Sequence, residues 1–197
     1  MNGNEKISID VVTGTGSCGT SFFIELLAKL NLTDIDGLYF NDKVKGGYEY
    51  SICSRFNVED LKNKRIIKDP RLYFGDFNTL IDYVDISLVW LCYRDFNQVS
   101  KSRIARELVM TKYASFEGKG IDTYSKQINL FEQGLIYTID FLTRYNIPLI
   151  LVDYESLHDP FYCWKCIIQS GKYDVSLEQV EQAHKEIYNV ELKHVYK

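Results

Sequence analysis

The sequence predicts an α/β protein in three layers, with a central parallel sheet flanked by helices on both sides. Three observations indicate this class. Short apolar runs are typical of buried strands, longer stretches carry apolar residues at helical spacing, and the two kinds alternate along the chain. Such alternation implies parallel strands connected by helices that cover both faces of the sheet. The 197 residues contain no repeat and no Pro- or Gly-rich linker, so a single domain over residues 1–197 is expected.

Four short segments are expected to form the strands. They are mostly apolar and rich in β-branched residues, and they span residues 7–13, 65–68, 87–93 and 149–153. We expect the first, third and fourth to be buried on both faces, as the central strands of a parallel sheet are. Ligands of such sheets bind beyond the carboxyl ends of the strands. The functional site is therefore expected just after Thr13, Lys68, Tyr93 and Asp153.

Five segments are expected to form helices: residues 20–30, a segment that starts after Asp95, and residues 124–146, 161–170 and 176–189. Asp95 is a typical N-cap, and Gln98 three residues later completes a capping-box pattern. The longest helix carries an apolar stripe that is expected to face the core, formed by Ile128, Phe131, Leu135, Ile139 and Leu142.

Composition excludes several classes of protein. The formal net charge of -4 disfavours a general nucleic-acid-binding protein, which usually carries a basic excess. The chain shows no secretory signal pattern and no apolar run near the ~18 residues of a membrane span, so a cytoplasmic protein is expected. The 5 cysteines are scattered and odd in number, which fits reduced thiols. Cys163 and Cys166 form a CxxC pair without further zinc ligands nearby, and inward packing on one helix face is the favoured interpretation.

A glycine-rich stretch, VTGTGSCGTSF at residues 12–22, joins the first predicted strand to the first predicted helix. Gly14, Gly16 and Gly19 allow a sharp turn whose backbone N–H groups face an anion. The N-terminus of the helix adds partial positive charge, and Thr20 and Ser21 add hydroxyl donors. This combination predicts an anion-binding loop.

The loop departs from two common nucleotide-binding patterns. In GxxxxGK[ST], Thr20 would occupy the position of the lysine that neutralises the β- and γ-phosphates. The dinucleotide pattern GxGxxG fits the glycines, but no acidic residue follows at the end of a second strand. An atypical P-loop nucleotide kinase or NTPase remains an alternative. In that alternative, Asp153 would be the carboxylate that binds Mg²⁺.

Cationic residues follow two further predicted strands. Lys68 ends one strand, and Arg71 follows it after the Asp69–Pro70 turn. Arg94 leaves the third strand directly before the helix cap, where a guanidinium can bind a phosphate through two hydrogen bonds. Ser102, Arg103 and Arg106 lie further along that helix. A solvated basic face accounts for Lys101 and Arg106, but it does not account for Arg94.

Together these motifs resemble those of the sulfotransferases that use 3′-phosphoadenosine 5′-phosphosulfate (PAPS). The segment SCGTS at residues 17–21 is similar to the family's 5′-phosphosulfate loop, and Arg94 followed by Ser102 matches the spacing of its 3′-phosphate site. KDPR at residues 68–71 resembles a segment in which some members carry a catalytic lysine. LVDYESLHDP at 151–160 is similar to the stretch after the last central strand. The resemblance covers roughly residues 7–165.

The resemblance implies a P-loop NTPase-like arrangement of the α/β layers and transfer of a sulfuryl group from PAPS to a hydroxyl acceptor. That acceptor would be a small molecule or a carbohydrate, and no metal would be required. The resemblance implies that Lys68 and Arg71 are catalytic. It implies that the donor is bound by Gly16, Ser17, Cys18, Gly19, Thr20, Ser21, Arg94 and Ser102.

Two departures from the family pattern bear on activity. Ser17 stands where the family usually has Arg or Lys, a cation that stabilises charge on the bridging oxygen as the sulfuryl group leaves. The expected enzyme is therefore weak or inactive unless Lys68 or Arg71 compensates. A non-catalytic anion-binding protein is the corresponding alternative. For the family's general base, Glu49 is one candidate, since it lies between the first helix and the Lys68 strand, although a solvated glutamate is the favoured interpretation.

Overall fold

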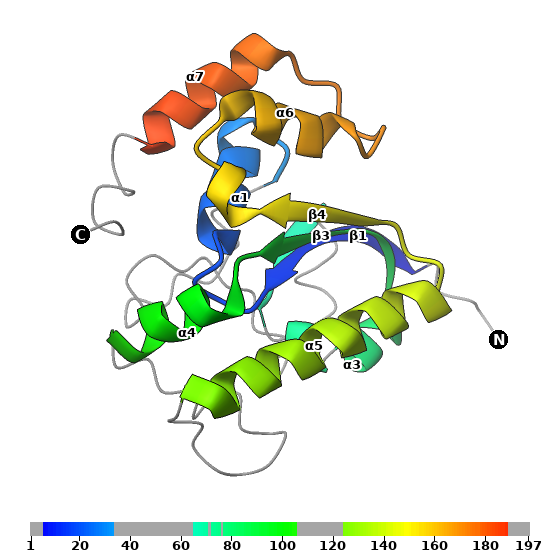
Figure 1. The fold of residues 1–197 in the computed structure, drawn as a ribbon. Helices are drawn as coiled ribbons and strands as arrows, with labels where there is room; N and C mark the ends of the chain where they lie inside the picture. The colour runs from blue at the N-terminus through cyan, green and yellow to red at the C-terminus, as the bar shows by residue number, and fades with distance from the viewer. Residues whose placement is uncertain (1–5, 34–64, 71, 76, 106–123, 189–197) are drawn as a thin grey trace, which may run out of the picture.

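The computed structural model describes residues 6–33, 65–70, 72–75, 77–105 and 124–188. Four parallel strands form one sheet in the order β2-β1-β3-β4 (Figure 1). Their bounds are Ile7–Gly14 for β1, Ile66–Lys68 for β2, Val84–Tyr93 for β3 and Leu149–Asp153 for β4. All four predicted strands are therefore present. Because they run parallel, their carboxyl ends lie at one edge of the sheet, as expected.

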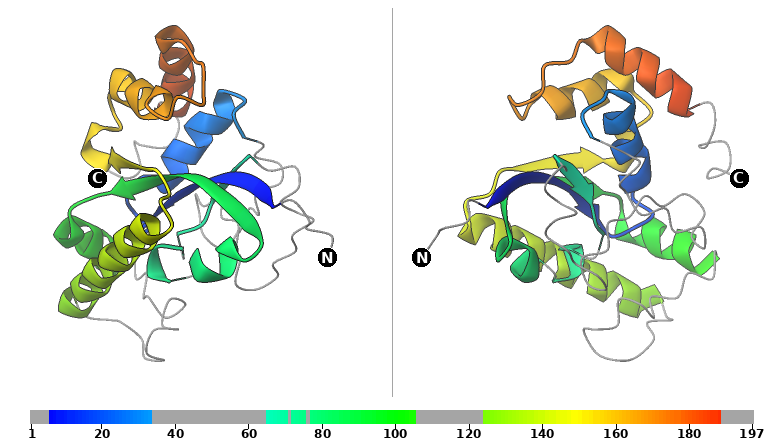
Figure 2. Two further views of the ribbon diagram at one scale, coloured as in Figure 1. Left: turned by 90° about the vertical axis from the view of Figure 1, so that its right-hand side faces the viewer. Right: turned by 180° about the vertical axis from the view of Figure 1, so that it is seen from behind.

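Helices cover both faces of the sheet, which confirms the predicted three-layer class. Figures 1 and 2 show α1, α6 and α7 on one face and α3, α4 and α5 on the other. The bounds are Thr20–Lys29 for α1, Phe77–Ile81 for α3, Phe96–Ala105 for α4, Tyr124–Arg144 for α5, Pro160–Ile168 for α6 and Leu177–Tyr188 for α7. Two 3-10 turns, η2 (Leu72–Phe74) and η5 (Tyr154–Ser156), follow β2 and β4.

Aromatic side chains fill both interfaces of the sheet. On the side of α1 and α6, the fully buried Trp90 of β3 packs 5.8 Å from the ring of Phe23, and its Nε1 donates to the Cys166 carbonyl at 3.1 Å. On the side of α4 and α5, a second buried cluster includes Leu91 and Phe131. Neighbouring residues of β3 thus supply both cores, which is the reason its sequence is a continuous apolar run.

The structure corrects two predicted burial patterns. Phe131 and Leu142 of α5 are buried as predicted, but Ile139 is 39% exposed, and Gly134 and Thr138 are buried in its place. The helix packs through these small residues, which apolar periodicity does not identify.

The prediction that residues 149–153 are buried on both faces is also wrong. The central residue of β4, Leu151, is 57% exposed because β4 is an edge strand of the sheet.

Cys163 and Cys166 are both buried on α6, as the packing interpretation predicts. The Cys163 thiol lies 3.5 Å from the Leu157 carbonyl oxygen. Burial raises the pKa of both thiols above the ordinary cysteine value. Both thiols are therefore neutral and form no disulfide, and both side chains contribute to packing.

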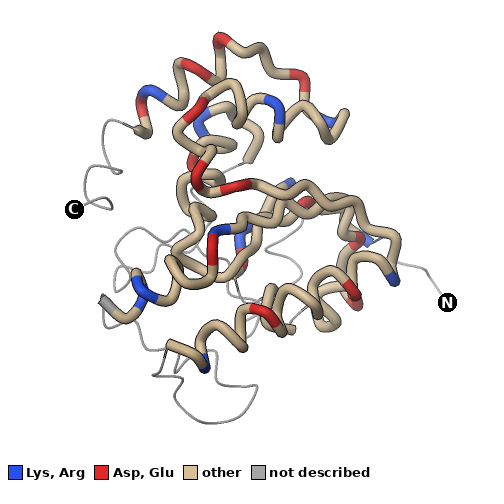
Figure 3. Tube along the Cα trace, viewed as in Figure 1, with Lys and Arg blue, Asp and Glu red and all other residues tan. Residues whose placement is uncertain are grey.

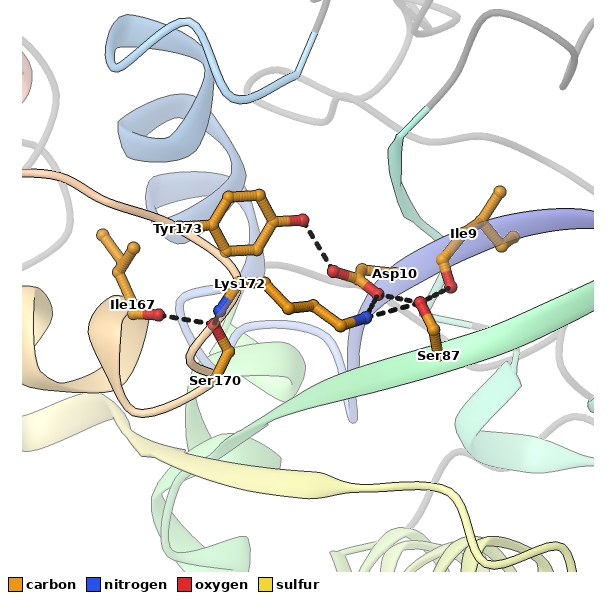
Figure 4. Close-up of polar contacts among 7 residues, drawn as sticks. All are labelled: Ile9, Asp10, Ser87, Ile167, Ser170, Lys172 and Tyr173. Atoms are coloured by element: carbon orange, nitrogen blue, oxygen red, sulfur yellow. Dashed lines mark hydrogen bonds and ion pairs between the residues drawn. The ribbon is translucent and has the colours of Figure 1, made fainter.

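A polar cluster connects the α6–α7 connection to the middle of the sheet (Figure 4). Asp10 of β1 is buried, and its carboxylate lies 2.7 Å from Lys172 Nζ and 2.6 Å from the Tyr173 hydroxyl. Ser87 of β3 completes the cluster, with Oγ 2.5 Å from Asp10 and 2.6 Å from Lys172 Nζ. A carboxylate in the sheet interior requires such partners, because an unpaired buried charge is strongly destabilising.

Replacing Gly134 by alanine is expected to destabilise the protein, although alanine usually favours a helix interior by about 1 kcal/mol. A Cβ atom at Gly134 would lie 2.6 Å from Tyr73 Cδ1 and 2.9 Å from the Tyr73 carbonyl oxygen. Tyr73 is buried and donates its hydroxyl to the Phe131 carbonyl, so it has little freedom to move. Overpacking costs about 1–3 kcal/mol, so a net loss of ~1–2 kcal/mol is expected in urea unfolding. A variant as stable as the wild type would contradict this close packing.

No helix in the described part of the chain is long and apolar enough to cross a membrane.

Candidate functional site

The glycine-rich loop lies between the end of β1 and the start of α1, at the edge where the four strands end. Gly16 and Gly19 have left-handed backbone angles, with φ of 72° and 88°. Ser17 also has a positive φ, 55°, which costs a non-glycine residue about 1 kcal/mol. Backbone strain of this kind is characteristic of ligand-binding loops, where the surrounding structure maintains it.

The loop is held in place by close contacts with the ends of β3 and β4. A Cβ atom on Gly14 would overlap the Cys92 carbonyl oxygen, and one on Gly19 would overlap the Leu157 side chain. Because Gly19 is also the N-cap residue of α1, this packing fixes the N-terminus of the helix against the segment after β4. A glycine-rich turn fixed at a helix N-terminus is the geometry that the predicted anion-binding loop requires.

Cys18 enters the predicted donor site through its backbone, because its side chain points into the core. The thiol is fully buried, and burial raises its pKa above the ordinary value. Cys18 therefore contributes a backbone N–H group to the loop, and its neutral thiol contributes to packing.

Native alkylation checks this orientation. We expect Cys18 to be modified by iodoacetamide at pH 8 at least ~100-fold more slowly in the folded protein than in urea, because only exposed thiolates react readily. Peptide mass spectrometry measures the rate at each cysteine. Rapid labelling of Cys18 in the folded protein would show that its side chain is accessible in the loop.

Lys68 lies beside the start of α1, as expected for a residue at the carboxyl end of a strand in a parallel sheet. The residue ends β2, pairs in register with Val12 of β1, and is 1% exposed. Its Nζ donates to Ser21 Oγ at 2.8 Å. The following turn is fixed by a hydrogen bond from Thr13 Oγ1 to the Asp69 carbonyl, also at 2.8 Å. A buried ammonium group thus lies beside the hydroxyl of the first turn of α1.

Arg94 reaches the loop from the end of β3. Its Nη1 lies 3.5 Å from the Ser17 carbonyl oxygen, and its guanidinium lies 4.2 Å above the Tyr154 ring. Nε contacts Gln98 Oε1 at 3.2 Å and Glu155 Oε1 at 3.5 Å. Stacking on an aromatic ring fixes the plane of the guanidinium. A phosphate bound here would meet a cation that is already oriented.

The start of α4 is capped as predicted, with one difference. Asp95 Oδ1 accepts a hydrogen bond from the Gln98 backbone N–H at 3.0 Å. The capping-box pattern predicts that the Gln98 side chain accepts a hydrogen bond from the Asp95 backbone N–H. The Gln98 side chain instead contacts Arg94. The cap therefore also helps to position the Arg94 guanidinium.

Two neighbouring residues of α4 differ in their relation to the loop. Ser102, the predicted 3′-phosphate ligand, is half-buried on the helix. Arg103 is only 7% exposed, and a Cβ atom on Gly16 would lie 2.8 Å from its Nη1. Sequence reasoning missed Arg103 as a site residue. The signal that could have identified it is its spacing of four from Val99, which places both side chains on the same side of the helix.

Asp153, the metal ligand of the kinase alternative, instead caps η5. Its carboxylate accepts hydrogen bonds from Ser156 Oγ at 2.6 Å and from the Glu155 backbone N–H at 3.4 Å. Within the described ranges, no group of three or more His, Cys, Asp or Glu side chains is arranged to hold a metal ion. Arg71, Glu49 and Arg106 lie outside the described residues.

The described site therefore combines the glycine-rich loop with three cationic side chains: Lys68, Arg94 and Arg103. Figure 3 shows that acidic and basic residues are interspersed over the helices on both faces of the sheet. Two of the three cations at the loop lie at strand ends, and the third, Arg103, lies on α4. This arrangement suits a ligand that carries several negative charges.

No family model and no curated protein matches the sequence. Among solved structures, the chain is similar to the sulfotransferase STF1 from Mycobacterium tuberculosis. The match has a TM-score of 0.57 and 15% identity, and it covers 98% of this chain and 76% of that one. The chain has a sulfotransferase fold.

A second solved structure, retinol dehydratase in complex with androsterone and the inactive cofactor PAP, matches with a TM-score of 0.46 and 17% identity. That match covers 90% of this chain and 64% of the other. The sulfotransferase fold confirms the predicted α/β class and the fold that the sequence resemblance implies. At 15% identity it establishes the architecture alone.

Proposed function

We propose that the protein is a sulfotransferase that moves a sulfuryl group from PAPS to a hydroxyl acceptor, a small molecule or a carbohydrate, in the cytoplasm. The observation that carries this proposal is the convergence of Lys68 and Arg94 on the glycine-rich loop. A single cation beside a loop is common. Two buried or half-buried cations from two strand ends, directed at the same loop, suit a donor with anionic groups at two positions.

The loop and α1 would bind the 5′ end of the donor. Gly19 is the N-cap residue of α1, and the Thr20 and Ser21 side chains lie in the first helical turn. Arg94 and Ser102 would bind the 3′-phosphate. Tyr154 supports Arg94 by stacking, and Glu155 contacts its Nε. The 3′-phosphate would compete with Glu155 for this guanidinium.

Sulfuryl transfer requires stabilisation of the leaving phosphate oxygen. The acceptor oxygen attacks sulfur in line, the sulfur–oxygen bond to the 5′-phosphate breaks, and its electron pair remains on that phosphate. Lys68, at the first turn of α1, would neutralise this developing charge, and Arg71 is the second proposed catalytic cation. The acceptor proton passes to a general base, for which Glu49 remains the sequence candidate.

A non-catalytic anion-binding protein is the second candidate, and Ser17 is the observation that favours it. The position at which the sequence resemblance implies a cation has a serine with φ of 55° whose carbonyl contacts Arg94. An atypical kinase is less well supported, because Thr20 replaces the loop lysine and Asp153 is engaged in capping.

Thermal stabilisation by nucleotides tests the donor assignment. We expect 3′,5′-adenosine bisphosphate to raise Tm more than 5′-AMP or ATP at equal concentration, because only a ligand bound to the native state stabilises it. The expected advantage over 5′-AMP vanishes in Arg94→Gln. An equal shift with 5′-AMP in the wild type would refute the 3′-phosphate site. Release of the bisphosphate from PAPS with an acceptor panel, followed by mass spectrometry, separates the enzyme from the non-catalytic candidate.

A further inference from the structure

Arg103 is a buried cation beside the glycine-rich loop that the motif comparison did not include. It lies on α4, is 7% exposed, and directs Nη1 toward the space above Gly16. A guanidinium at this position lies within reach of an anion that the N–H groups of the loop would hold. Arg103 is therefore a candidate ligand-binding residue on geometric grounds.

The loop itself provides no positive side chain at this point. Residues 14–22 contain neither lysine nor arginine. Lys68 is directed to Ser21, in the first turn of α1, and Arg94 approaches the Ser17 carbonyl from β3. Arg103 reaches the loop at Gly16 from a different element. The three cations thus approach successive parts of the same loop.

Gly16 leaves the space that this approach requires. The absence of a side chain at Gly16 allows the guanidinium to lie close to the loop backbone, and the φ of 72° also favours glycine. The planar guanidinium can bind two oxygens of a phosphate or sulfate through two parallel hydrogen bonds, a fixed geometry that a lysine ammonium does not provide. Because Arg103 lies beside Gly16, it would contact the same anionic group that the loop N–H groups are proposed to bind.

We infer that Arg103 supplies the positive charge that the loop lacks and binds the anionic group at the 5′ end of the donor. This inference rests on the proposed function and assigns Arg103 a separate subsite from Arg94. Arg94 would discriminate the 3′-phosphate, and Arg103 would discriminate the 5′ group.

Isothermal titration with three nucleotides tests the inference. Affinities for 3′,5′-adenosine bisphosphate, 5′-AMP and 3′-AMP are measured with the wild type, Arg103→Gln, Arg103→Lys and Arg94→Gln. Lys101→Gln is the matched control, because it removes an exposed charge from the same helix. Thermal melts verify that each variant folds.

Arg103→Gln is expected to weaken binding of the bisphosphate and of 5′-AMP by about 10- to 100-fold, as loss of a charged hydrogen bond does, with 3′-AMP changed less than ~2-fold. Arg103→Lys should give a smaller loss with the same selectivity, which keeps the test valid if the glutamine variant does not fold. Arg94→Gln should show the opposite selectivity. Lys101→Gln should leave all three affinities within ~2-fold.

Equal losses for 3′-AMP and 5′-AMP in the Arg103 variants would show a structural role and overturn the inference. Affinities that match those of Lys101→Gln would overturn it as well. A different result would refute the proposed function, namely a wild type that binds the bisphosphate no more tightly than 5′-AMP. Even then, a selective loss of 5′-AMP affinity in Arg103→Gln would support the contact between Arg103 and the 5′ group. A wild type that binds none of the three nucleotides would refute both the proposed function and the role of Arg103.

Discussion

Under the proposed sulfotransferase function, replacing Lys68 by methionine is expected to lower kcat for sulfuryl transfer by about 10²- to 10³-fold, the usual effect of removing one group that stabilises transition-state charge. The Lys68 side chain is 1% exposed and its ammonium donates to Ser21 Oγ at 2.8 Å, so its charge lies where water is largely excluded. Methionine has a similar length and is easily buried, so the fold should be preserved. The affinity for 3′,5′-adenosine bisphosphate should fall far less than kcat.

Steady-state rates of bisphosphate release from PAPS, together with nucleotide titrations, measure the two effects separately. Ser21→Ala is the matched control, because it removes the hydrogen-bond partner of Lys68 and keeps the charge. A loss of about 3- to 10-fold is expected for Ser21→Ala, the size of one neutral hydrogen bond. If Lys68→Met retained kcat within ~3-fold of the wild type, Lys68 would have no catalytic role.

Replacing Lys172 by methionine is expected to lower the free energy of unfolding by about 2 kcal/mol. Lys172 Nζ lies 2.7 Å from the carboxylate of Asp10, whose side chain is 4% exposed. Without Lys172, a carboxylate in the middle of β1 loses its counter-charge and retains the hydroxyls of Ser87 and Tyr173. The expected loss is below the ~3–5 kcal/mol of a fully buried pair because Lys172 itself is 38% exposed.

A double-mutant cycle with Asp10→Asn separates the pair from its surroundings. Asparagine removes the charge and retains the hydrogen-bonding groups, so the double variant should be less destabilised than the sum of the two single changes. Lys29→Met serves as the surface control. Its partner Glu186 lies 3.3 Å away, both side chains are nearly half exposed, and a loss below ~0.5 kcal/mol is expected. Equal effects of Lys172→Met and Lys29→Met in urea unfolding would contradict the buried-charge interpretation.

The main elements of the site could be predicted because they depend on local pattern and on one geometric rule. Buried strands are short apolar runs, and parallel strands end at one edge, so Lys68 and Arg94 could be placed beside the loop. The cap formed by Asp95 also follows from local sequence, since a capping side chain reaches only a few residues.

For Arg103 the local sequence offers one signal, its spacing of four from Val99, which by itself does not separate it from the polar neighbours Lys101, Ser102 and Arg106. Which side of α4 faces the loop depends on how this helix packs against α5 and the sheet. The same limit applies to Gly134, whose role is to contact Tyr73, 61 positions earlier in the sequence. The predicted apolar stripe of α5 was partly wrong because close packing of a small residue outweighs the burial of Ile139.

By itself, the sequence determined the α/β class, the four strands, the capped helices and the glycine-rich loop, because each depends on side-chain preferences over a few neighbouring residues. Only the tertiary structure decided which residues meet across long separations. It pairs Asp10 with Lys172, directs Arg103 at Gly16, turns Cys18 into the core and leaves β4 at the edge of the sheet. These contacts depend on the packing of whole elements, and the free energy of burying or exposing one side chain there depends on partners that local sequence does not contain.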